Sequence, residues 1–212
     1  MKPQLGDTIL NRYTLVSSLR EEPGIQAWKA NDRVLAKDCQ LFIITDRSAF
    51  AAIDKLAGRI AATRPDRVIP ILKYRMESDV LLIVMPVDSG QCLTDYMVDT
   101  AKPLSSSTIR SIIGVCADVL REVIADTPSG IVITTDTVRV TTSGVQIADA
   151  PCATMLADTS ATDLRTDGPE RYAIRQLAAL LYTLLTRTPS QATPPFNLRA
   201  LPQNTPDENN KN

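Results

Sequence analysis

The side chains available for chemistry in this sequence are carboxylates, lysines, arginines, hydroxyls and four thiols, because its 212 residues include no histidine. The lack of histidine excludes Ser-His-Asp triads, Cys-His dyads, histidine metal sites and the commonest general base. Any catalytic site in this chain would therefore have to use acidic, basic or hydroxyl groups.

The four cysteines are widely spaced and form no Cys-x-x-Cys pair; they are Cys39, Cys92, Cys116 and Cys152. This spacing disfavours a zinc site or a disulfide framework and favours the reduced thiols of a cytosolic protein. We therefore expect no bound metal and no cofactor.

Charge and composition indicate a soluble globular chain. The 23 basic and 24 acidic residues leave a net charge of −1, which argues against nucleic-acid binding by bulk electrostatics. No segment approaches the roughly 18 apolar residues of a membrane span, and the first residues lack the apolar core of a signal peptide. Any membrane attachment is expected to lie outside this chain.

The first part of the chain has the pattern of short strands with one helix among them. The predicted strands cover residues 13–19, 26–30, 39–45, 68–74 and 80–87. The helix is predicted to start at a cap on Ser48, because apolar residues recur at spacings of three and four from Phe50 to Ile60. It must end before Pro65. The strand at 80–87, VLLIVMPV, is nearly all apolar and is predicted to be buried on both faces.

After a break at residues 88–90 the pattern becomes helical. Residues 105–107 are predicted to cap a helix with one apolar face through 124, and a second helix begins at 167–169 and carries leucines from 177 to 185. Short strands are predicted at 131–135, 138–141 and 145–148, with a turn at residues 143 and 144. We expect residues 152–167 to form a loop and the chain from 188 onward to be extended or disordered. The order of elements is that of an α+β protein.

Several motifs in this order resemble those of bacterial Ser/Thr protein kinases. The similar segments are RYTL at 12–15, LAKDCQLF at 35–42, LIVM at 82–85, GIV at 130–132 and ALLYTLLT at 179–186. The resemblance covers about residues 9–188. It implies a two-lobed protein kinase-like fold with an N-lobe at 1–88, a truncated helical C-lobe at 89–188 and a tail at 189–212. Met85 takes the gatekeeper position.

At the phosphate-binding positions the sequence departs from the kinase pattern. The loop glycines that let backbone amides approach phosphate oxygens are replaced by Arg20, Glu22 and Ile25. Phe42 stands where kinases carry the lysine that pairs with the α- and β-phosphates. For Phe42 the sequence leaves two interpretations open: it fills the former nucleotide pocket, or it packs as an ordinary strand residue.

The catalytic segment is also degenerate. An H-R-D loop cannot exist without histidine, and the segment is about three residues shorter than the kinase pattern. Thr137 takes the place of the metal-binding asparagine, and Asp149 matches the aspartate of D-F-G but is followed by Ala-Pro. The aspartate that anchors the catalytic loop in kinases corresponds to Ala173. We therefore expect a pseudokinase without phosphoryl-transfer activity.

Among degenerate kinases, three segments resemble the pseudokinase domain of the actinobacterial MurJ/MviN lipid II flippases. These are PGIQAWKANDRVLAKDCQLFI, GIVITTDTVRVTTSGVQIADAP and AIRQLAALLYTLLTR. The resemblance implies a regulatory domain at the cytoplasmic face of the plasma membrane that controls peptidoglycan-precursor transport. It also implies that a Ser/Thr kinase modifies a threonine, which then recruits a protein with a forkhead-associated domain. Thr205 is the first candidate acceptor; further candidates are Thr154, Thr159, Thr162 and Thr166.

Two other functions stay open at this stage. The chain could be a nucleotide-binding protein that holds ATP and a metal through Asp149 and Asp136. Asp149 could also be an ordinary loop residue with no ligand. It could also be a stand-alone adaptor unrelated to a transporter. Trp28 and the leucines at 177–185 are expected to be packing residues in either case.

Overall fold

The computed structural model describes residues 2–77, 79–99, 103–124, 131–156, 168–188 and 197–202. The chain divides into two compact units, Met1–Ser89 with Asp149–Thr159, and Gly90–Ala148 with Ser160–Asn212. The sequence assigned everything between residues 89 and 188 to one helical domain. In the structure the segment that begins at Asp149 instead belongs to the first unit, because its contacts are with that unit's residues.

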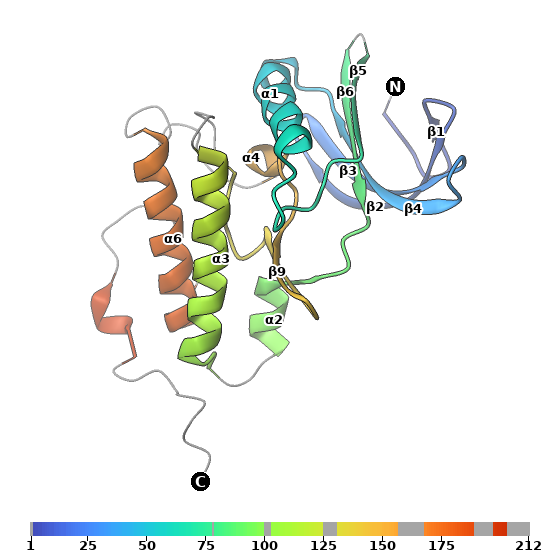
Figure 1. Cartoon of the computed structure of the whole chain (residues 1–212). Helices are drawn as coiled ribbons and strands as arrows, with labels where there is room; N and C mark the ends of the chain where they lie inside the picture. The colour runs from blue at the N-terminus through green and yellow to red at the C-terminus, as the bar shows by residue number, and fades with distance from the viewer. Residues whose placement is uncertain are drawn as a thin grey trace. The chain divides into compact units, whose positions relative to one another are not determined.

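The first unit contains a six-stranded antiparallel sheet in the order β1-β2-β3-β4-β6-β5 (Figure 1). The strands are β1 (Thr8–Ile9), β2 (Tyr13–Glu22), β3 (Ile25–Asp32), β4 (Lys37–Ile44), β5 (Lys73–Glu77) and β6 (Val80–Pro86). The apolar strand β6 is buried along its length, as its sequence predicts. The predicted strand at 68–74 is wrong for most of its residues, since β5 begins only at Lys73. Pro70, which cannot donate a ladder hydrogen bond, explains the later start.

Helix α1 (Arg47–Thr63) lies beside this sheet (Figure 1). Its N-cap is Asp46 and not Ser48: the Asp46 carboxylate accepts hydrogen bonds from the Ser48 amide at 2.9 Å and from its hydroxyl at 2.7 Å. The predicted apolar spacing is confirmed, because Phe50 and Ile60 are buried with the residues spaced between them. The helix ends before Pro65, as predicted.

A paired arginine and aspartate fix the end of the sheet at which β2 begins and β3 ends, opposite the β2–β3 hairpin. Arg12 donates to the two carboxylate oxygens of Asp32 at 2.9 and 2.6 Å, and Asp32 also accepts from the backbone N–H groups of Val34 and Leu35. Asp32 is 5% exposed. The hydrogen bond from Arg12 is the main reason that the pKa of Asp32 falls to about 2.

This pair predicts a specific acid sensitivity. Because the pKa of Asp32 is lower in the folded chain than its ordinary value near 3.9, its ion pair stabilises the fold fully above about pH 4. That stability is lost as the pH falls from about 4 to about 2. Asp32→Asn should therefore be less stable than the wild type at neutral pH, with the difference vanishing near pH 2. Urea unfolding at stepped pH measures this, and a constant difference at all pH values would contradict it.

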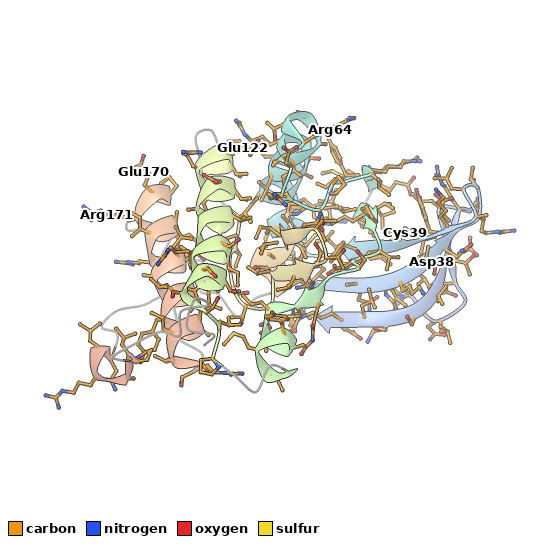
Figure 2. All side chains as sticks on the ribbon, turned by 60° about the horizontal axis from the view of Figure 1, so that its bottom comes forward. Asp38, Cys39, Arg64, Glu122, Glu170 and Arg171 are labelled. Atoms are coloured by element: carbon orange, nitrogen blue, oxygen red, sulfur yellow. The ribbon has the colours of Figure 1, made fainter. Side chains whose placement is uncertain are left out.

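Burial also affects a thiol on the same sheet. Figure 2 shows Asp38 and Cys39, which are consecutive residues of β4. Burial, together with the carboxylates of Asp32 and Asp38, raises the pKa of the Cys39 thiol to about 11. The four cysteines are free thiols, and three of them are buried. Cys39 is therefore a packing residue and not a reactive nucleophile.

The second unit combines a small sheet with helices. Its elements are β7 (Gln91–Cys92), α2 (Leu93–Asp99), α3 (Ser106–Ile124), β8 (Val138–Thr141), β9 (Gly144–Ile147), α6 (Pro169–Thr186) and the 3₁₀ helix η1 (Leu198–Ala200), with sheet order β7-β8-β9. Helices α3 and α6 lie side by side (Figure 1). Figure 2 shows Glu122 near the C-terminal end of α3 and Glu170 and Arg171 at the first turn of α6, at the same end of the pair. The two helices are thus antiparallel.

The sequence predictions for this unit are confirmed in part. Helix α6 begins with Gly168 as N-cap and Pro169 in its first turn, as predicted. Residues 131–135 form no strand, and the turn between β8 and β9 lies at residues 142 and 143, one position earlier than predicted. The loop at 152–167 contains a short helix, α4 (Ala153–Leu156), which lies in the first unit, and residues 157–167 lie outside the described ranges. Within the described residues, no helix combines the length and the apolar character needed to cross a membrane.

Candidate functional site

The β2–β3 hairpin carries the side chains that the sequence resemblance assigns to the kinase glycine positions. Arg20 donates a hydrogen bond to the backbone carbonyl of Leu156, the last residue of α4. Its Nε atom also lies 3.5 Å from a carboxylate oxygen of Glu22. Both side chains therefore contact other protein groups of the first unit. A negative carboxylate at Glu22 also disfavours a phosphate at this hairpin.

The turn of this hairpin contains a glycine that serves packing. Gly24 has φ +79°, and a Cβ atom placed on it would lie 2.6 Å from the Cβ atom of Asp46. The carbonyl of Gly24 accepts hydrogen bonds from the amides of Thr45 and Asp46 at 2.8 and 3.2 Å. Gly24 is thus needed where the hairpin turn meets the start of α1. Ile25, the next residue, is 1% exposed and begins β3.

Phe42 and Met85 are both inside the sheet. Phe42 is 0% exposed and pairs with Ala27 of β3 on one side and with Ile83 of β6 on the other. Met85 is 1% exposed and pairs with Gln40. Phe42, which the sequence resemblance assigns to the lysine position of kinases, is therefore a fully buried aromatic side chain.

Asp149 lies in the first unit, with the hairpin and Phe42, and not in the second unit with Asp136 and Thr137. It is half-buried, has φ +60°, and its Oδ1 atom lies 3.5 Å from Nε2 of Gln40. Its backbone carbonyl accepts a hydrogen bond from Cys152 at 2.6 Å. Burial raises the pKa of the Cys152 thiol well above its ordinary value, and the Asp149 charge raises it further. The structure thus gathers Arg20, Glu22, Phe42, Met85 and Asp149 in one unit.

Thr137 and Asp136 belong to the second unit. The Thr137 hydroxyl donates to the carbonyl of Val132 at 2.9 Å and accepts from the amide of Thr134 at 2.9 Å, with the residue 4% exposed. It holds the turn of residues 134–137 and has little freedom to bind a metal. Asp136 is exposed, and its Oδ1 atom accepts a hydrogen bond from the Thr94 hydroxyl at 2.8 Å.

Gln176 anchors this same segment and was missed by sequence reasoning. Its Oε1 atom accepts a hydrogen bond from the amide of Ile133 at 2.5 Å, and its Nε2 atom donates to the carbonyl of Ile131 at 3.4 Å. Ala173, which the sequence resemblance assigns to the anchoring aspartate of kinases, is buried and carries no polar group. Gln176 lies three residues, slightly less than one turn, after Ala173 on α6. The sequence did contain a signal for this role: a glutamine lies on the apolar face of the predicted helix, three residues after Ala173. Because a buried amide group needs hydrogen-bond partners, such a glutamine indicates a contact with another segment.

The next question is whether potential metal ligands are grouped anywhere in the described residues. In the described ranges, no three His, Cys, Asp or Glu side chains are grouped to hold a metal ion. Thr205 lies outside these ranges, as do Thr159, Thr162 and Thr166. The backbone of Thr154 is in α4, but its side chain is not described.

Comparison with known proteins shows the fold. No family model matches the chain, and no curated protein matches it. The structure of Rad53 residues 1–466 in complex with AMP-PNP is similar, with a TM-score of 0.67 and 16% sequence identity over 86% of this chain. The match spans about half of that chain, 51% of its length. Because Rad53 is a kinase, the comparison shows that this chain has a kinase-like fold.

Proposed function

We propose that this chain is a catalytically inactive kinase-like domain that works as a regulatory docking module. The observation that carries this proposal is Phe42, which is 0% exposed at the position of the phosphate-binding lysine. Phosphoryl transfer depends almost entirely on positioning and charge neutralisation by such cations and by metal ions. An aromatic side chain supplies neither.

The β2–β3 hairpin supports the same conclusion. Arg20 is engaged with the Leu156 carbonyl, and Glu22 places a negative charge beside it. A glycine-rich loop brings bare backbone amides to the phosphates, whereas these side chains occupy that space with charged groups of both signs. Loss of several positioning groups together is expected to lower the rate by many orders of magnitude.

The docking role is proposed by analogy with the flippase-associated pseudokinases. In this proposal a Ser/Thr kinase phosphorylates a threonine, Thr205 in the first instance, at the cytoplasmic face of the membrane. Phosphorylation adds about −1.5 to −2 charges and three acceptor oxygens, which the arginines of a forkhead-associated domain can bind. The bound protein would then link the chain to control of lipid II transport. A stand-alone adaptor would share the phosphothreonine but not the neighbouring transporter.

The decisive experiment tests whether recruitment depends on phosphate. The chain is phosphorylated by a bacterial Ser/Thr kinase, and binding of a forkhead-associated domain is measured by calorimetry. We expect binding of the phosphorylated chain only, with loss of binding in Thr205→Ala and retention in Thr188→Ala, an exposed threonine just after α6. Binding that persists after phosphatase treatment would contradict the docking mechanism. Retained binding in Thr205→Ala would move the acceptor to another threonine.

A thermal-shift measurement distinguishes the nucleotide-binding alternative from the proposed docking function. The similar structure of Rad53 is a complex with AMP-PNP, so at least one protein with this fold binds a nucleotide. A ligand at 100 times its dissociation constant adds about 2.7 kcal/mol of stability. We expect no shift with ATP and Mg²⁺. A shift that disappears in Asp149→Ala, or autophosphorylation with radiolabelled ATP, would favour the alternative.

A further inference from the structure

The turn that joins β3 to β4 carries exposed apolar side chains at one end of the six-stranded sheet (Figure 1). It consists of residues 33–36, RVLA, because Asp32 and Lys37 form the last pair of the two strands. Val34 is 70% exposed and Leu35 is 58% exposed. These two neighbouring side chains therefore contribute little to the core of the unit and form an apolar tip on its surface.

The usual chemistry of turns does not explain this composition. Turns are mostly built from glycine, proline, asparagine, aspartate and serine, and residues 33–36 include none of these. Ala36 has φ +51°, a left-handed conformation that favours glycine. The turn thus keeps apolar residues where polar residues or glycine would fold more easily. Such a departure from the favoured residues indicates a role in binding.

Backbone groups of the turn find their hydrogen-bond partners inside the protein. The Asp32 carboxylate accepts hydrogen bonds from the amides of Val34 and Leu35 at 3.0 and 3.3 Å. The amide of Arg33 donates to the carbonyl of Arg12 at 3.0 Å. These amides therefore need no water as a partner. The tip can enter an apolar medium more easily for this reason, because an amide that loses water without gaining a partner is strongly disfavoured there.

Two cations flank the apolar tip, one on each side in the sequence. Arg33 and Lys37 are exposed, and neither forms an ion pair with another residue in the part of the chain that the structure describes. The two carboxylates of this hairpin, Asp32 and Asp38, are each held by a different cation, at N–O distances of 2.6 and 2.9 Å. The hairpin therefore presents two apolar side chains between two positive charges that are not neutralised.

We propose that this tip binds the surface of an anionic lipid bilayer, with Val34 and Leu35 inserted at the headgroups and Arg33 and Lys37 against the lipid phosphates. Apolar side chains next to cations are the combination that attaches proteins peripherally to anionic membranes. A lipid surface supplies acyl chains and negative charge together, and it needs no pocket shaped to receive a projecting tip. The contact requires no membrane-spanning segment and does not depend on the docking function proposed above.

The size of the tip sets the strength of this contact. Each cation near an anionic surface strengthens binding by about fivefold, and only two aliphatic side chains are inserted. We therefore expect weak and reversible binding that requires millimolar lipid. Because the charges are exposed, salt should weaken the binding further.

Co-sedimentation of the full, unphosphorylated chain with lipid vesicles tests the proposal. The vesicles contain equal parts of phosphatidylglycerol and phosphatidylcholine, at up to about 10 mM lipid and about 0.05 M salt. We expect the wild type to bind, and to bind at least about tenfold more weakly to vesicles of phosphatidylcholine alone. The double variant Arg33→Gln/Lys37→Gln should lose at least about tenfold on the anionic vesicles. Val34→Glu should lose a similar factor, because it places a carboxylate in the inserted tip.

Two control variants separate the tip from surface charge and exposed apolar residues in general. Arg67→Gln/Arg199→Gln removes two other exposed cations, and Val98→Glu changes a valine of α2 that is 75% exposed. Both should stay within about threefold of the wild type. A wild type that does not bind the anionic vesicles, or equal losses in the tip and control variants, would contradict the proposal. Neither outcome bears on phosphothreonine docking, because the chain in this experiment is unphosphorylated.

Discussion

Replacing Phe42 with lysine is expected to lower the free energy of unfolding by more than about 3 kcal/mol and not to create ATP binding. Phe42 has no exposed surface and lies between β3 and β6 in the middle of the sheet. The change removes the packing of an aromatic ring and places a charged ammonium among apolar strands. A buried, unpaired charge is among the most costly single changes in a protein.

Urea unfolding and a thermal-shift assay with ATP and Mg²⁺ measure the two effects of this substitution separately. Phe42→Leu is the matched control: it keeps an apolar side chain, should cost less than Phe42→Lys, and should likewise show no nucleotide shift. If Phe42→Lys were as stable as the wild type and gained a shift with ATP, the side chain would face an open site. The proposal of an inactive domain would then fail.

Replacing Gln176 with leucine is expected to cost about 2 to 4 kcal/mol of stability. The substitution keeps the side-chain volume on α6 but leaves the Ile133 amide and the Ile131 carbonyl without their partner. Gln176 is 3% exposed, so water cannot easily replace the lost hydrogen bonds. The cost arises mainly from two buried backbone groups and not from lost packing.

Hydrogen exchange at the Ile133 amide gives a direct readout of this anchor. The amide should exchange at least about tenfold faster in Gln176→Leu, while amides of β4 in the other unit keep their rates. Ile174→Gln on the same helix is the control, because Ile174 is 66% exposed and its replacement should change stability by less than about 0.5 kcal/mol. If Gln176→Leu changed the free energy of unfolding by less than about 0.5 kcal/mol, residues 131–133 would not depend on Gln176 for their stability.

Strong local patterns were sufficient to predict several elements from the sequence. The uninterrupted apolar run of β6 indicated burial on both faces, and the three-and-four spacing from Phe50 to Ile60 indicated the buried face of α1. Gly168 and Pro169 marked the start of α6. In each case the side chains of one segment carry the information, because periodicity and the backbone limits of glycine and proline act locally.

Other features depended on neighbours that are distant in sequence. Asp46 and Ser48 are both good helix caps, and the choice of Asp46 depends on the hairpin turn at Gly24 that meets it. The run at 131–135 is β-branched and reads as a strand, yet it has no partner strand among the described residues. Its backbone is held by Gln176 and Thr137 instead. Propensity favours a strand, but only hydrogen-bond partners decide whether one forms.

For the candidate site, the sequence by itself determined that no histidine is present. It also determined which side chains, Arg20, Glu22, Ile25 and Phe42, stand at the positions that the kinase resemblance assigns to the loop glycines and the phosphate-binding lysine. Only the tertiary structure decided what the remaining groups do. It placed Asp149 in the unit of the hairpin, joined Arg20 to the Leu156 carbonyl, and held the backbone of residues 131 and 133 through Gln176 and not through Ala173. The identity of a side chain is a local property of the sequence, whereas its partners are set by chain segments that meet only on folding.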